Sequence, residues 1–184
     1  IQHAVGIAAA LLLGAAVRRV TRSAWAGLLS AAVVLLDPDQ IFLEHAIMSE
    51  SWATLAIAFS LYAGVRSCEE SPRWWSWPLL TGVSLAVAVM IRTSALSMVP
   101  VVALALILHR PQPFRRRRES LRAAAVLVCT VGLLLLTFAG ASAASGQRFG
   151  IAPSPGWYLY GRVAQFANCQ NFTPPPGIAA LCQK

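Results

Sequence analysis

The sequence contains few charged residues and only one lysine, Lys184. Charged side chains make up 12% of the 184 residues, whereas a soluble domain usually carries about a quarter. Hydrophobic residues make up 57% and repeat in blocks along the chain. This pattern excludes an ordinary soluble domain and predicts an all-α, polytopic helical membrane protein. The number of membrane-spanning helices is therefore estimated by dividing the chain into segments of roughly 20 residues, the length that one such helix needs.

Several signature motifs are also missing. We find no GxGxxG, Walker loop, CxxC or nucleophile elbow, so nothing indicates a dinucleotide site, a nucleotide phosphate loop, a CxxC metal or redox site, or a serine hydrolase. The chain has no initiator methionine, and no basic region precedes its first apolar run. We therefore expect a fragment of a longer protein rather than a chain with a signal peptide.

The apolar runs predict about five to six transmembrane helices in residues 1–140. Proline at position 38 should end the second run, because proline cannot continue a helix cheaply. Ser49 is the expected N-cap of the third run, and a row of Gly6, Ala10 and Gly14 should let another helix approach closely. Residues 141–184 form a separate predicted segment rich in glycine, proline and aromatic residues. The predicted runs are 4–17, 24–36, 52–65, 74–91, 95–108 and 123–139.

The basic residues predict the orientation in the membrane. The net charge is +8, and 14 of the 15 basic residues are arginines, a bias that hints at a GC-rich bacterial genome. The links 18–23, 66–75 and 109–122 hold 11 of the 15. Because cytoplasmic links carry the excess of arginine and lysine, we expect these links inside the cell. We expect residues 37–50, the turn at Arg92 and the C-terminal segment outside it. The arginines are interpreted as topological, and no nucleic-acid partner is expected.

The stretch 36–50 concentrates the acidic side chains. Four of the seven acidic residues lie there together with His45, and ionisable groups at membrane depth are functional candidates. Carboxylates suit Mg²⁺ or Mn²⁺, and a histidine favours softer metals, although the spacing matches no metal-binding signature. Asp37 and Asp39 are also explained as turn formers around Pro38. The candidate binding residues are Glu44, His45 and Glu50, with Glu50 the candidate metal ligand.

Arg92 is the second candidate, since it interrupts an apolar sequence on the side opposite the arginine-rich links. Its planar guanidinium could bind a phosphate through two hydrogen bonds. It could equally extend its side chain to lipid headgroups. We expect two helices joined by a tight polar turn at Arg92, because residues 82–108 are too long for one span.

The C-terminal segment offers a disulfide and an aromatic cluster. We predict a bond between Cys169 and Cys182, since an oxidising compartment favours it. The aromatic residues around Gly156–Arg162 could line a sugar or lipid headgroup site, or could simply hold a loop on the membrane surface.

Four short motifs resemble the GT-C glycosyltransferase superfamily: Gln2-His3-x-x-Gly6, Asp37-Pro38, Ile47-Met48-Ser49-Glu50 and Arg92-Thr93-Ser94-Ala95. The chain is most similar to bacterial protein mannosyltransferases and aminoarabinose transferase-like enzymes, the family-39-like, phospholipid carrier-dependent transferases. The resemblance covers roughly residues 1–140.

This resemblance implies that a sugar passes from a polyprenyl-phosphate donor in the membrane to an acceptor on the outer face, in many members with a divalent metal. It implies an acidic role for Glu50 and a phosphate-facing role for Arg92, whereas Glu44 and His45 have no counterpart. The catalytic base of the family lies in a long first outer loop, which this sequence does not show.

Two other functions compete with this one. A transporter or flippase also places charges near broken helices, although we see no internal repeat. A non-catalytic membrane subunit would explain the missing loop.

Overall fold

The computed structural model describes residues 2–38, 41, 49–69, 74–108, 117–147 and 149–151 of the chain. These residues form helices, with no strand among them. The chain divides into two compact units, Ile1–Phe138 and Ala139–Lys184; the predicted boundary at residue 140 stays a prediction. The elements are α1 (Gln2–Thr21), α2 (Ala24–Leu36), α4 (Glu50–Ser67), α5 (Ser76–Ile91), the 3₁₀ helix η1 (Thr93–Ser97), α6 (Met98–Leu108) and α7 (Arg117–Ala144).

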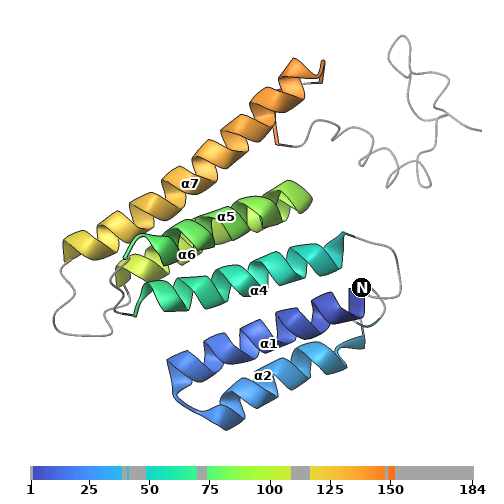
Figure 1. The fold of residues 1–184 in the computed structure, drawn as a ribbon, viewed down its shortest axis with the longest axis vertical. Coiled ribbons are helices and arrows are strands. Elements are labelled where there is room, and N and C mark those ends of the chain that lie inside the picture. Colours follow the sequence, from blue (N-terminus) through green and yellow to red (C-terminus); the bar gives the residue numbers. More distant parts are fainter. Residues whose placement is uncertain are drawn as a thin grey trace, which may run out of the picture. The chain divides into compact units, whose positions relative to one another are not determined.

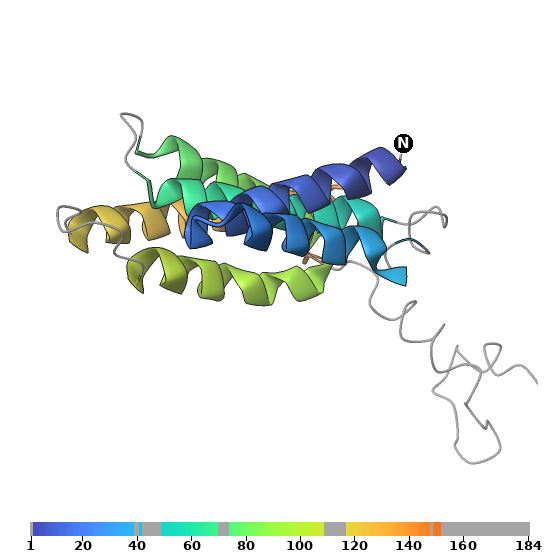
Figure 2. The same cartoon turned by 90° about the horizontal axis from the view of Figure 1, so that it is seen from below.

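Helices of the first unit lie side by side, and their directions alternate along the chain (Figure 1). α1 packs against both α2 and α4, and α4 packs against α5. α1 and α4 run the same way, while α2 and α5 return, as a second view also shows (Figure 2). The helix ends are therefore sorted into two groups. One end of this helix group holds the end of α1, the start of α2, the end of α4 and the start of α5, and the other end holds the starts of α1 and α4 and the end of α5.

The helix boundaries follow local signals in the sequence. Ser23 caps α2, because its hydroxyl accepts a hydrogen bond from the Ala26 N–H at 3.3 Å. α2 ends at Leu36, and its C-cap Asp37 is extended and precedes Pro38. Arg92 is also extended and separates α5 from η1 and α6, so the predicted break is confirmed. Ser49 occupies the N-cap position of α4 as predicted, but its backbone is helical and its side chain makes no capping hydrogen bond.

The described core consists mainly of small residues, and many large apolar side chains face outward. Most buried apolar residues are alanine, such as Ala10, Ala63 and Ala86. Trp25 and Leu133, by contrast, are among the large apolar residues left exposed. A soluble core would reverse this distribution. Helices that pack closely through small residues while presenting large apolar ones to lipid are typical of membrane proteins.

Three glycines mark two close approaches between helices. A Cβ atom added to Gly14 of α1 would lie 2.7 Å from the carbonyl oxygen of Gly27 in α2, and one added to Gly27 would lie 2.7 Å from that of Gly14. A Cβ at Gly82 of α5 would lie 2.9 Å from the Leu127 carbonyl oxygen of α7. These carbonyl oxygens belong to the helix backbones, so they could make room for a Cβ atom only if the helices moved apart. The expectation that the small-residue row admits a neighbouring helix is confirmed at Gly14.

Two of the described helices are long and apolar enough to cross a membrane. They are Gln2–Thr21 and Arg118–Ala144, and the shorter apolar helices are Ala24–Leu36, Ser76–Ile91 and Thr93–Leu108. Together with the small-residue core, they make this chain an all-α membrane protein. The number of five to six spans stays a prediction.

Gly132 provides a test of this packing, since a Cβ added there would meet no atom within 4 Å. Glycine inside a helix costs roughly 0.5–1 kcal/mol relative to alanine. We expect Gly132→Ala to leave the protein folded and to raise its stability by about that amount. The unfolding temperature in detergent measures the change, and a marked decrease would show that α7 is packed more tightly there than the structure indicates.

Candidate functional site

Glu50 and Arg92 come together, although 42 positions separate them in the sequence. Glu50 is the first residue of α4, and Arg92 follows the last residue of α5. The antiparallel packing of these two helices brings the ends together. The Arg92 guanidinium nitrogen Nη1 lies 3.8 Å from Glu50 Oε1. Both residues were singled out in the sequence for different reasons, and the fold makes them one charged pair.

The backbone holds Arg92 firmly at this position. Its N–H donates to the Ala88 carbonyl at 2.7 Å, and its own carbonyl accepts from the Ala95 N–H at 2.9 Å. These two hydrogen bonds connect the Arg92 backbone to both α5 and η1. Glu50 lies in the first turn of α4, where the partial positive charge of the helix N-terminus favours a carboxylate.

The Glu50–Arg92 pair is accessible to water, and its two charged groups are not in hydrogen-bonding contact. The Arg92 side chain is 56% exposed and that of Glu50 is 27% exposed. At 3.8 Å the two atoms attract each other but form no hydrogen bond. Because a guanidinium has five N–H donors, Arg92 can keep this attraction and still bind an anion.

The structure describes only some of the other residues that the sequence analysis singled out. Asp37 is the C-cap of α2, and its carbonyl accepts a hydrogen bond from the Ile41 N–H at 3.0 Å, which agrees with its interpretation as a turn former. Glu44 and His45 lie outside the described residues, as do Asp39 and the predicted Cys169–Cys182 disulfide. In the described part of the chain, no three His, Cys, Asp or Glu side chains gather to hold a metal ion.

A second charged group lies at the other end of the first unit, where sequence reasoning had assigned only topology. Arg19 of α1 donates a hydrogen bond to Glu69, beyond the end of α4, at 2.7 Å. Arg66 lies 3.0 Å from the other oxygen of Glu69. The Arg19 guanidinium also lies over the ring of Tyr62, 5.6 Å from its centroid. The i, i+3 spacing of Arg66 and Glu69 was a local signal for part of this group, whereas their meeting with Arg19 of α1 left none.

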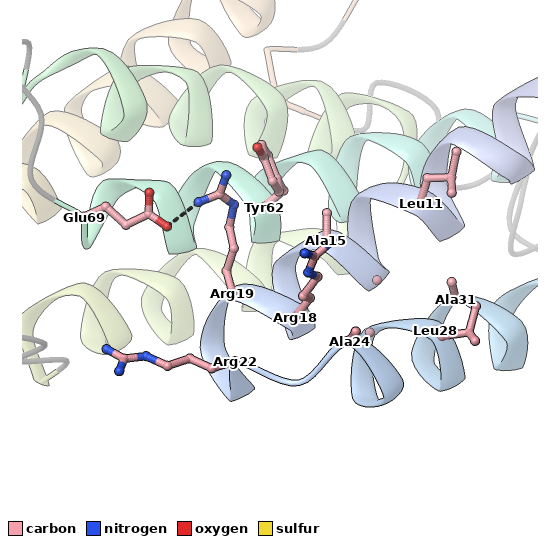
Figure 3. A pocket seen from close by; sticks show the side chains of 12 residues that line it. Leu11, Ala15, Arg18, Arg19, Arg22, Ala24, Leu28, Ala31, Tyr62 and Glu69 are labelled. Carbon is pink, nitrogen blue, oxygen red and sulfur yellow. Dashed lines mark hydrogen bonds and ion pairs between the residues drawn. The ribbon is translucent and has the colours of Figure 1, made fainter.

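A cavity of about 780 Å³ lies beside this group. Figure 3 shows Arg19 reaching from α1 toward Glu69, with the Arg18 and Arg22 side chains on the same stretch of chain. α1, α2 and α4 contribute to the lining, together with Arg22 between α1 and α2 and Glu69, two residues beyond the end of α4. We call it the arginine cavity. Its lining residues are Leu11, Gly14, Ala15, Arg18, Arg19, Arg22, Ala24, Gly27, Leu28, Ala31, Tyr62 and Glu69.

The fold and these groups define a helical membrane protein with an acid–arginine pair at one end of its first unit and an arginine-rich end opposite. The family model of dolichyl-phosphate-mannose-protein mannosyltransferases matches residues 2–145. The chain belongs to this family of membrane glycosyltransferases, and its resemblance to the GT-C superfamily is confirmed. Neither a curated protein nor a solved structure matches the chain.

Proposed function

We propose that the protein transfers a sugar from a polyprenyl-phosphate donor to an acceptor outside the cytoplasm, with Arg92 binding the donor phosphate. The 3.8 Å approach of Glu50 and Arg92 carries this proposal. It joins a phosphate-binding group and a carboxylate at the end of an apolar helix pair. A lipid donor can reach such a place from the membrane, while a polar acceptor arrives from water. The family match supports the reaction class.

In the transfer, an acceptor hydroxyl oxygen attacks the anomeric carbon of the sugar. The bond between that carbon and the phosphate oxygen breaks, and its electron pair leaves with the polyprenyl phosphate. A base takes the proton of the acceptor hydroxyl. The phosphate gains negative charge as the bond breaks, so a nearby cation lowers the barrier. Arg92 supplies this cation, and its fork of N–H donors matches the phosphate oxygens.

Glu50 positions Arg92 and orients the acceptor in this proposal. A carboxylate near a guanidinium restricts where the long arginine side chain points, because the two charges attract each other. The second Glu50 oxygen stays available to accept a hydrogen bond from a sugar or acceptor hydroxyl. We assign no general base among the described residues. Glu44 and His45 remain proposed contributors to substrate binding, on the predicted outer stretch that precedes α4.

A divalent metal at Glu50 is a separate proposal. Mg²⁺ and Mn²⁺ prefer several oxygen ligands, and the described residues do not provide such a set at this site. The described residues alone therefore do not fit a metal ion. The charge stabilisation proposed above is assigned to Arg92 and not to a metal.

The orientation in the membrane is also proposed. We infer that the end with Glu50 and Arg92 lies outside the cytoplasm and that the arginine-rich end lies inside. The positive-inside rule supports this assignment, and so does the sorting of the charges along the helices. Arg18, Arg19 and Arg22 gather at the end opposite to Glu50 and Arg92.

A transfer assay tests the proposed function. Membranes that contain the full-length protein should transfer label from polyprenyl-phosphate-linked [³H]mannose, the donor that the family name suggests, and release polyprenyl phosphate in equal amount. Control membranes that lack the protein should show neither product. Other polyprenyl-phosphate sugars extend the assay if mannose is not the sugar. If no donor releases its sugar and the intact lipid donor is instead transported across the membrane, the result would support the flippase alternative.

A further inference from the structure

We propose that the arginine cavity binds the phosphate headgroup of an anionic phospholipid. The cavity lies on α1, α2 and the end of α4, whereas the proposed donor site lies at the start of α4 and the end of α5. The inference therefore concerns a second lipid site at the opposite end of the helices, and it does not rest on the proposed transfer reaction.

The charge balance of the cavity favours an anion. Three arginines line it, and Glu69 is its one lining carboxylate. Glu69 is already engaged by Arg19 at 2.7 Å and by Arg66 at 3.0 Å. The side chains of Arg18 and Arg22 form no ion pair with any described residue. Two guanidinium groups thus remain to bind a phosphate, which they recognise through charge-assisted hydrogen bonds.

The backbone at Arg22 adds a second indication. Arg22 has φ 56°, in the left-handed region, and is the one described non-glycine residue with a positive φ. Glycine would take this conformation more easily. The chain nevertheless places a guanidinium at this turn, and strained positions of this kind cluster at binding sites. The conformation sets Arg22 at the rim of the cavity, where α1 passes into α2.

The apolar wall of the cavity points to a lipid rather than to a free phosphate. Leu11 and Leu28 line the cavity and are 62% and 59% exposed. Leu11 lies seven residues before Arg18, so the wall extends about 10 Å along α1 away from the arginine end. An amphiphile with a phosphate at one end and acyl chains at the other fits this order. Basic pockets between membrane helices are known to take such headgroups.

The volume and the floor also suit a headgroup. A cavity of about 780 Å³ falls in the size range of small-molecule sites, which are roughly 300–1,000 Å³. Gly14, Ala15 and Gly27 form its floor, where α1 meets α2, and none of them has a side chain larger than a methyl group. Tyr62 contributes a hydroxyl that can donate to a phosphate oxygen.

The test measures lipid binding to the full-length protein in detergent, by native mass spectrometry over a titration. Phosphatidylglycerol is the anionic probe and phosphatidylcholine the zwitterionic control. We expect the double variant Arg18→Gln/Arg22→Gln to bind phosphatidylglycerol about tenfold more weakly. The matched variant Arg118→Gln/Arg122→Gln removes the same charge from α7, outside the cavity, and should change the binding less than about twofold.

A third variant separates binding from folding. Arg22→Gly removes the guanidinium and relieves the positive φ, so the unfolding temperature should stay the same or rise while phosphatidylglycerol binding falls. A fall in both would show that Arg22 is structural, and it would overturn the proposal.

Three further results would also overturn it. They are equal losses in both double variants, equal binding of the two lipids, and displacement of phosphatidylglycerol by inorganic phosphate at comparable concentration. The last result would mean that the cavity takes a free phosphate and that the apolar wall has no part in recognition.

Discussion

Replacing Arg92 with alanine should reduce sugar transfer by about 100-fold, because the charge that develops on the departing phosphate loses its cation. Glu50→Gln should lower transfer less, by about tenfold, since it loosens the orientation of Arg92 without removing the cation. Arg92→Lys should recover only part of the activity, because an ammonium group keeps the charge but lacks the planar fork. Initial rates over a range of donor concentrations measure these effects.

A double variant shows whether the two residues act together. If Glu50 works through Arg92, Glu50→Gln should add little to the loss already caused by Arg92→Ala. If their roles are independent, the two losses should multiply. Arg122→Ala is the matched control, since it removes an exposed arginine near the start of α7 and should leave transfer unchanged. Full activity in both Glu50→Gln and Arg92→Ala would end the site assignment.

Replacing Gly27 with alanine should destabilise the protein by about 1–3 kcal/mol, the usual cost of inserting atoms into a closely packed interface. The new Cβ would lie 2.7 Å from the Gly14 carbonyl oxygen and 2.9 Å from the Arg18 Cβ. α1 and α2 would have to move apart. The unfolding temperature in detergent measures the loss.

Gly132→Ala is the control for this effect, because it makes the same chemical change where no atom lies within 4 Å. A similar shift for both variants would contradict the close α1–α2 contact. A decrease for Gly27→Ala alone would support it.

Much of the fold could be predicted from the sequence because apolar runs and their interruptions are local signals. The run 24–36 became α2 with the same bounds, and Pro38 marks its end as expected. The break at Arg92 was also predicted. α1 and α7 extend beyond their predicted runs by whole turns, because arginine and serine continue a helix at little cost.

The candidate site was only partly predictable. Glu50 and Arg92 could each be identified from its neighbours in the sequence, but their 3.8 Å approach depends on how α4 packs against α5. The arginine cavity was missed for the same reason. Arg18, Arg19 and Arg22 are explained by topology alone until Tyr62 and Glu69 are placed beside them. Contacts between distant segments leave no mark in a single sequence.

The short length of α5 has a consequence for the membrane around the protein. Its 16 residues rise about 24 Å, whereas the hydrocarbon core of a bilayer is about 30 Å thick. Trp74 and Trp75 precede the helix and should anchor it at one interface. On the prediction that α5 is one of the membrane spans, we expect the bilayer beside it to thin by several ångströms, at a modest cost for each. Such thinning would lower the opposite headgroup layer toward Arg92, so the thickness of the surrounding lipid helps to set how far a lipid phosphate must travel to reach it.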